Sequence, residues 1–149
     1  MENQETRELY NEIENLISLI EQPKNDKRLL ELNNIDLDFK LFPIIISIAK
    51  LQPITVRELS IFSGQPHSTT SRQLQRLKAS NLIVSTVNPL DTRSRVIKLS
   101  DDGIDLLDKI KKGKLSFLDR AFSEVPKSKI KTISENLSLL TKILIAQSY

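Results

Sequence analysis

Apolar residues recur at helical spacing along most of the chain. They form one stripe near each end, at Leu9, Ile13, Leu16, Ile17 and Ile20 and at Ile130, Ile133, Leu137, Leu140 and Leu144. Such spacing places each stripe on one side of a helix and predicts terminal helices over about residues 3–22 and 126–146. Similar patterns predict further helices over about residues 38–50, 56–63, 66–80 and 101–122.

Several residues mark where these helices begin and end. Asp38 and Ser100 are suitable N-caps, because their side-chain oxygens accept bonds from the free amides of a first turn. Thr55 with Glu58 three residues later has the pattern of a capping box. Gly64 ends the short helix that they begin.

Two segments leave alternatives open. Residues 23–37 are mostly polar, which predicts a connection with one helical turn at Asp26–Leu32. In the helix after Asp38, Pro43 lacks an amide hydrogen, so this helix either starts late or is kinked. The apolar run Ile44–Ile48 also fits a buried strand on composition alone.

The period of the pattern changes after Asn81. Residues 82–87 and 95–99 predict two strands, joined by the loop Asn88–Ser94. The short helix, tight turn and second helix before them form a helix-turn-helix arrangement. We therefore expect a mainly α (α+β) fold.

The predicted helix over residues 66–80 has an unusual polar face. Thr70, Leu74 and Leu77 form its inward stripe, and at about 100° per residue the opposite side carries Ser68, Arg72 and Gln75. Beside this side lie Thr69, Ser71 and Arg76. No acidic residue occurs between Pro66 and Leu90.

This face has the hydrogen-bonding groups that nucleic acids require. Arginine bonds guanine edges, glutamine bonds adenine, and serine or threonine bonds phosphate oxygens. The plainer interpretation is a solvated helix face. Likewise, His67 is more simply an exposed residue of the first turn than a phosphate contact or a pH sensor. The acidic residues that follow Ser100 fit a helix N-terminus better than a metal site.

Composition narrows the function further. The 149 residues carry a net charge of +3 and fit one domain or a compact unit with appended helices. The absence of cysteine excludes disulfides, thiolate metal sites and thiol-based redox sensing. We find no catalytic set, phosphate-binding glycine loop or metal spacing, so we expect neither an enzyme nor a resident cofactor. The polar N-terminus and short apolar runs predict a cytoplasmic protein without a membrane span.

Residues 54–103 resemble the winged helix-turn-helix core of MarR-family transcriptional regulators. The most specific signal is the order S-T-x-S-R-x-L-x-R-L, then D-x-R, then L-S-x-x-G. The resemblance implies that Ser68, Thr69, Ser71 and Arg72 face the major groove of DNA, where Gln75 and Arg76 are further candidate contacts. It also implies that Arg93 enters the minor groove, with Arg95 nearby and Asp91 orienting the wing arginines.

Two positions depart from the family pattern. Asn88 stands where an acid is usual, and Thr92 where a basic residue is common, which predicts a weaker wing contact. The exposed position of Leu90 has no explanation in the pattern. The alternative for Asp91 and Arg93 is a surface ion pair that only steadies the turn.

The apolar stripes of the terminal helices need a partner surface. The resemblance implies an intertwined homodimer, in which these stripes, represented by Leu9, Ile13, Leu16, Ile133, Leu137 and Leu140, form the dimerisation surface. The competing arrangement is a bundle within one chain. We expect residues 1–37 and 104–149 to serve dimerisation and residues 38–103 to form the DNA-binding lobe.

The sequence thus predicts a homodimeric transcriptional regulator, expected to be a repressor, that binds a pseudo-palindromic site in double-stranded DNA. The resemblance also implies release by a small organic effector, which no residue here identifies. The alternative is a winged-helix protein-interaction module with little DNA affinity, as the weakly basic wing suggests.

Overall fold

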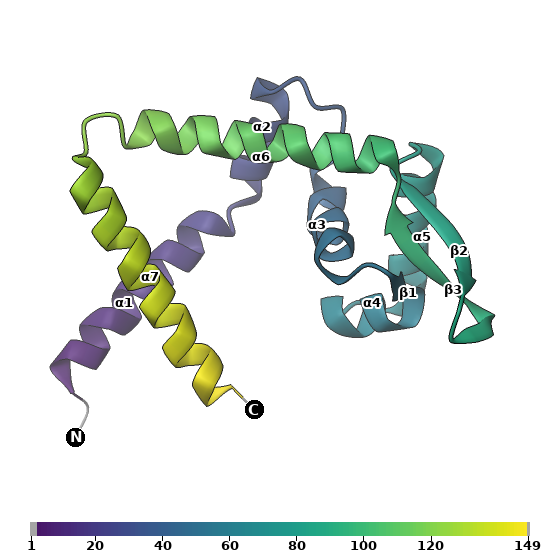
Figure 1. Ribbon diagram of the computed structural model, residues 1–149, viewed down its shortest axis with the longest axis horizontal. Coiled ribbons are helices and arrows are strands. Elements are labelled where there is room, and N and C mark those ends of the chain that lie inside the picture. Colours follow the sequence, from purple (N-terminus) through teal and green to yellow (C-terminus); the bar gives the residue numbers. More distant parts are fainter. Residues whose placement is uncertain (1–2, 149) are drawn as a thin grey trace. The chain divides into compact units, whose positions relative to one another are not determined.

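A computed structural model describes residues 3–148 (Figure 1). The elements follow in the order α1 (Gln4–Ile20), α2 (Pro23–Leu32), the 3-10 helix η1 (Phe39–Leu41), α3 (Phe42–Leu51), β1 (Ile54–Thr55), α4 (Val56–Ser63), α5 (His67–Ala79), β2 (Ile83–Asn88), β3 (Asp91–Leu99), α6 (Asp101–Ala121) and α7 (Lys127–Gln147). The chain forms two compact units that divide within α6, after Lys112. The first unit contains the helix-turn-helix and the sheet. Within residues 3–148, no helix is both long and apolar enough to cross a membrane.

The predicted helices are confirmed with two differences, one over residues 23–37 and one at the start of the helix after Asp38. The region of residues 23–37 contains a full ten-residue helix, α2, instead of a single turn. Pro23 fits the start of α2 because its missing amide hydrogen would be unpaired there anyway. Leu30 is buried with Phe42 and Ile110, so tertiary packing stabilises a helix whose own sequence is mostly polar.

Asp38 is a cap, but for η1 rather than for α3. Its Oδ1 accepts a hydrogen bond from the Lys40 amide at 3.0 Å. The helix α3 begins later, at Phe42, with Pro43 in its first turn. The run Ile44–Ile48 is helical, so the strand alternative is wrong. Ile45 and Ile48 of this helix are fully buried.

Both ends of α4, the first helix of the helix-turn-helix, are capped as the sequence predicts. The Glu58 amide donates to Thr55 Oγ1 at 3.2 Å, and the Thr55 amide donates to Glu58 Oε2 at 2.9 Å, which completes the capping box. Gly64 ends α4 with φ +65°, a left-handed conformation that favours glycine. The capping box thus fixes where α4 begins, and Gly64 fixes where it ends and how the chain enters the turn before α5.

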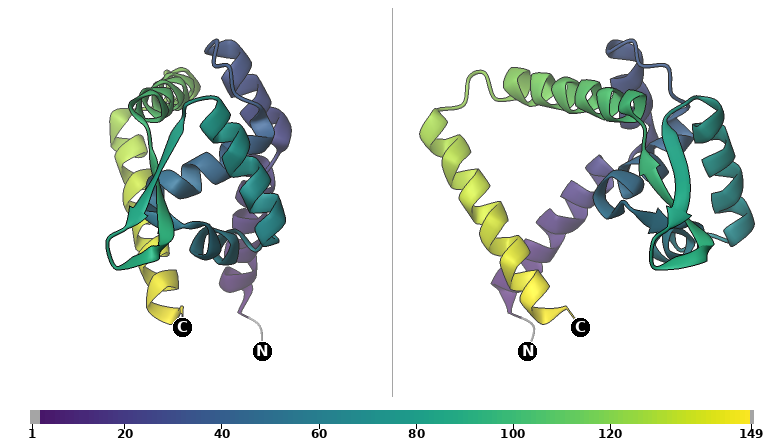
Figure 2. Two further views of the ribbon diagram at one scale, coloured as in Figure 1. Left: turned by 90° about the vertical axis from the view of Figure 1, so that its right-hand side faces the viewer. Right: turned by 45° about the vertical axis from the view of Figure 1, so that its right-hand side comes forward.

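The sheet has three antiparallel strands in the order β1-β3-β2. The hairpin is tighter than predicted, because β2 reaches Asn88 and β3 starts at Asp91. The predicted loop over residues 88–94 is therefore wrong, and only Pro89 and Leu90 separate the strands. The pairing is irregular near this tip, because Val87 pairs with Arg95 and Asn88 with Asp91, and the hairpin opens out there (Figure 2). The strand β1, which is only two residues long, was not predicted.

Two buried clusters hold the first unit together. The larger cluster joins α3, α4, α5 and the sheet through residues that include Ile45, Leu59, Leu77 and Ile97. The second comprises Leu30, Ile35, Phe42 and Ile110 and attaches α2 and the first half of α6 to α3. The helix α5 is thus fixed by the larger cluster on one side only.

Gly103 sits where α6 begins, against the backbone of Leu82. A Cβ atom at Gly103 would overlap the Leu82 carbonyl oxygen, whereas a Cβ atom at Gly64 would meet no atom of the described residues within 4 Å. We expect Gly103→Ala to lower the free energy of unfolding by about 3 kcal/mol because the backbone must shift. Gly64→Ala should lower the free energy of unfolding by about 1 kcal/mol, because only the left-handed backbone conformation opposes the added methyl group. Urea unfolding of both variants checks this, and equal losses would contradict it.

The capping box makes stability depend on pH. Backbone and side-chain hydrogen bonds from Thr55 hold the pKa of Glu58 below its ordinary value of 4.5. The charged carboxylate therefore stabilises the fold above pH 4.5, and this contribution is lost as the pH falls through the lowered pKa. We expect wild type to exceed Glu58→Gln in stability at neutral pH and to match it in acid. A difference that is independent of pH in urea unfolding would refute this.

Candidate nucleic-acid interface

The inward and outward faces of α5 lie as the sequence predicts. Thr70, Leu74 and Leu77 are buried, and the Thr70 hydroxyl donates to the Pro66 carbonyl at 3.3 Å. Ser68, Arg72 and Gln75 are exposed, while Thr69 and Ser71 are half-buried beside them. The packing of α5 therefore turns hydroxyl, amide and guanidinium groups toward solvent.

The two flanks of α5 face different neighbours. Ser71, Gln75 and Lys78 line a shallow hollow of about 230 Å³, together with residues of α4 and the sheet that include Ser85 and Ile97. This flank is turned toward the β2–β3 hairpin. The helical period places Thr69 and Arg76 on the other flank.

Arg72 lies in the middle of the exposed face. Its Nε donates to the Ser68 carbonyl at 3.4 Å, a weak bond within the helix that leaves most guanidinium N–H groups available. His67 is exposed in the first turn, as predicted, and its Nδ1 lies 3.4 Å from Ser71 Oγ. Arg72 is thus presented to an approaching ligand without a strong partner among residues 3–148.

Arg76 is in a different situation, which sequence reasoning missed. Its Nη2 donates to Asp38 Oδ2 at 2.8 Å in an ion pair. The Arg76 bond, followed by the Lys40 amide bond, holds the pKa of Asp38 below its ordinary value. The acid lies 38 positions away in the chain, so the acid-free stretch in the sequence does not leave α5 without an acidic neighbour in space.

The tip of the hairpin is organised by two side chains that bond to nearby backbone amides. Asn88 Oδ1 accepts from the Leu90 amide and Asp91 Oδ1 from the Arg93 amide, each at 3.0 Å. Asn88 Nδ2 also donates to Ser94 Oγ at 3.0 Å. Asp91 therefore holds the backbone amide of Arg93. Leu90 is 94% exposed at the tip.

Arg95 is held by a residue that the sequence did not single out. Its Nε donates to Ser85 Oγ at 2.9 Å and its Nη2 to the Ser85 carbonyl at 2.7 Å. Strand alternation places Arg95 on the same side of β3 as Ile97, which lines the hollow beside α5, whereas the register shift between Val87 and Asn88 interrupts the alternation before Arg93. The sequence does place this serine and this arginine on neighbouring predicted strands. Only the register of the sheet, which the sequence pattern does not specify, shows that they are in contact.

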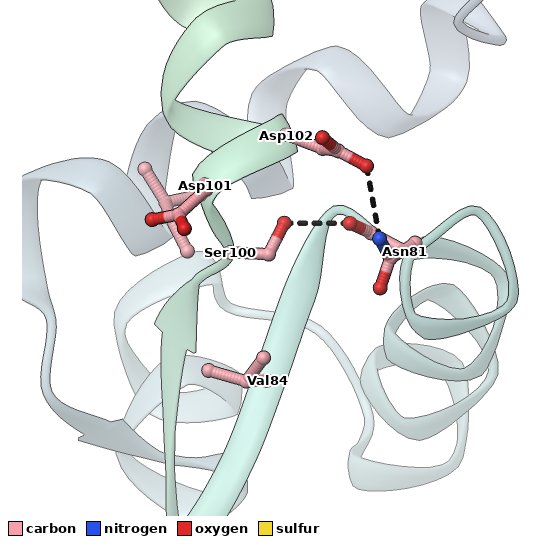
Figure 3. A pocket seen from close by; sticks show the side chains of 6 residues that line it. Asn81, Val84, Ser100, Asp101 and Asp102 are labelled. Carbon is pink, nitrogen blue, oxygen red and sulfur yellow. Dashed lines mark hydrogen bonds between the residues drawn. The ribbon is translucent and has the colours of Figure 1, made fainter.

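A second hollow, of about 410 Å³, lies at the start of α6 (Figure 3). Asn81 Nδ2 donates to Asp102 Oδ2 at 2.9 Å, and the Ser100 hydroxyl donates to the Asn81 carbonyl at 2.5 Å. Ser100 Oγ also caps α6 by accepting from the Gly103 amide. Across the described residues, no three histidine, cysteine or acidic side chains are grouped so that they would hold a metal ion.

The terminal helices keep their apolar stripes open within one chain. In α1, Leu9 and Leu16 are exposed and Ile13 is half-buried; in α7, Ile133 and Leu137 are exposed and Leu140 is half-buried. Over their described lengths, neither helix has a fully buried residue. Each stripe is therefore an apolar surface that its own unit leaves in contact with water.

No family model matches this sequence, and no curated protein does. Solved structures do match over nearly the whole chain. A MarR family protein from Bacillus stearothermophilus is 16% identical with a TM-score of 0.79, over 97% of this chain and 99% of that one.

Two Staphylococcus aureus structures are also similar. A mutant of MepR bound to an oligodeoxyribonucleotide is 20% identical with a TM-score of 0.62, over 91% of this chain and 97% of that one. MarR in complex with salicylate and kanamycin is 20% identical with a TM-score of 0.66, over 97% of each chain. The helix-turn-helix, the hairpin and the flanking helices thus together form the winged-helix fold of MarR-family transcriptional regulators.

Proposed function

We propose that this protein is a DNA-binding transcriptional regulator of the MarR type. The observation that carries the proposal is the exposed face of α5, where Ser68, Arg72 and Gln75 project without an acidic side chain among them. These groups match the acceptors and donors of base edges and phosphates. The DNA-bound structure of the similar MepR mutant supports the proposal.

The geometry suggests how α5 and the hairpin divide the contact. A recognition helix enters the major groove with its N-terminal residues near the base edges, which here are Ser68, Thr69 and Arg72. The hairpin projects beside α5 and carries Arg93 at its tip, where the narrow minor groove of A·T-rich DNA attracts an arginine. Asp91 assists by holding the backbone of Arg93, and Ser85 by holding the side chain of Arg95.

We extend the proposal to a homodimer. Its support is the pair of apolar stripes on α1 and α7, each of which its own unit leaves exposed to water. Burial against a second copy would remove this surface from water at a gain of roughly 25 cal/mol per Å². A symmetric dimer also matches a pseudo-palindromic site, with half-sites about one helical turn apart. Residues 38–103 would then be the DNA-binding lobe, and residues 1–37 and 104–149 the dimerisation parts.

Regulation by a small organic ligand completes the proposal. The salicylate complex of the similar S. aureus MarR supports it. The expected direction is repression, relieved when a ligand lowers the population of the DNA-binding conformation.

A protein-interaction module is the second candidate function. It is favoured by Leu90, an apolar side chain that is 94% exposed at the hairpin tip, and by Asn88 and Thr92 in place of charged residues. The two candidates differ in their response to salt. Phosphate contacts give an affinity that falls steeply as salt rises, whereas an apolar protein contact is nearly insensitive to salt.

We predict that Arg72→Ala lowers the affinity for an operator duplex by about 1–3 kcal/mol and relaxes the sequence preference, because a bidentate base contact is lost. Arg93→Ala should also weaken binding, mainly at sites with a narrow minor groove. Fluorescence anisotropy with duplexes selected from genomic DNA measures both effects. Lys131→Ala, on α7, removes the same charge elsewhere and is the control. Unchanged affinity in both arginine variants would refute the proposed function.

Leu137→Asp tests the dimer. We expect this variant to sediment as a monomer and to lose most of its operator affinity, because a charge in an apolar interface is poorly solvated and each monomer reaches one half-site. Ser138→Asp adds the same charge about 100° further around α7 and should remain dimeric. A monomeric wild-type protein, or a dimer unaffected by Leu137→Asp, would contradict the homodimer.

A further inference from the structure

Arg76 occupies the flank of α5 that faces away from the hairpin. When a recognition helix lies in a major groove, its outward face meets base edges and its flanks meet the phosphates on either side. Arg76 lies in the last turn of α5, one turn beyond Arg72. It is therefore placed for a phosphate contact, which adds affinity without reading sequence.

The partner of Arg76 is a fixed acid. Asp38 Oδ2 receives the Arg76 bond at 2.8 Å, while Oδ1 accepts the Lys40 amide and caps η1. The carboxylate is thus anchored to the backbone, whereas the Arg76 side chain is 55% exposed on a flexible stem. The Asp38 carboxylate is charged at neutral pH, as an ordinary aspartate is, and the Arg76 and Lys40 hydrogen bonds lower its pKa further.

This arrangement differs from that of the other arginines on the surface. Arg72 bonds only weakly to its own helix, and Arg95 is held by the neutral Ser85. Both keep their full positive charge for an anion. Arg76 instead faces a carboxylate that cancels its charge and repels any phosphate approaching the same flank.

We propose that Asp38 competes with DNA phosphate for Arg76 and thereby limits the sequence-independent part of the DNA affinity. The inference rests on the proposed function. A phosphate gains Arg76 only by displacing or sharing the Asp38 bond. The protein thus keeps its base-reading groups while one backbone contact is weakened, which reduces its retention on non-operator DNA.

The test uses the full-length protein with two duplexes, one of random sequence and one selected by the wild-type protein. Asp38→Asn removes the charge but keeps an amide oxygen for the η1 cap, because asparagine is as good a cap as aspartate. Asp36→Asn removes the same charge from an exposed position two residues earlier and is the matched control. Circular dichroism and thermal unfolding verify that each variant is folded.

We expect Asp38→Asn to bind the random duplex about fivefold more tightly near 0.15 M salt. The plot of log K against log salt concentration should be steeper by about 0.9, which is the change that one added phosphate contact produces. Asp36→Asn should leave the slope unchanged. Adding Arg76→Gln to Asp38→Asn should abolish the gain, and Arg76→Gln alone should bind more weakly than wild type, because Asp38 then faces the phosphates unpaired.

Two outcomes would overturn the inference. Unchanged affinity and slope in Asp38→Asn would mean that Arg76 makes no phosphate contact. Weaker binding by Asp38→Asn would mean that Asp38 orients Arg76 for DNA rather than withholding it. Either outcome leaves the proposed function intact if wild type binds in a salt-dependent manner and Arg72→Ala weakens operator binding. If those two conditions also fail, the proposed function itself is wrong.

Discussion

The burial of one side of α5 determines what the opposite side can do. Thr70, Leu74 and Leu77 are buried, and the two leucines pack into the cluster formed with α3, α4 and the sheet, which fixes the rotation of α5 about its axis. A rotation by one residue, about 100°, would bury Ser71 and turn Thr70 outward. The core therefore sets which polar groups α5 presents, before any ligand is considered.

Polar contacts then set how freely each basic group can move. Ser85 fixes the side chain of Arg95, and Asp38 pairs with that of Arg76. Arg72 has only a weak bond within its own helix, and Asp91 bonds only the backbone of Arg93. A side chain held in place loses less conformational entropy on binding, and one that is ion-paired must exchange partners. Two surfaces with the same number of arginines can thus differ in their affinity and selectivity for an anionic ligand, because the uncharged and acidic residues beside those arginines differ.

The sequence was sufficient where a local pattern determines the structure. The α5 stripe, the Thr55–Glu58 capping box and the Ser100 cap depend on residues within one or two turns, and all were predicted. The sequence was insufficient where distant segments decide: α2 is stabilised by packing on Phe42 and Ile110, and β1 exists only through pairing with β3. Arg76 was recognised as a surface arginine, but its pairing with Asp38 depends on tertiary structure that no periodicity contains.

The central claim is that the outward face of α5 lies against DNA, and site-specific crosslinking tests it most directly. The chain has no cysteine, so Ser68→Cys introduces a single thiol on this face, and Ser138→Cys introduces one on α7. With a thiol-reactive probe on an operator duplex, a covalent adduct is predicted at position 68, within the major groove, and not at position 138. Stable DNA binding by a folded Ser68→Cys protein without a crosslink at that position would contradict the account.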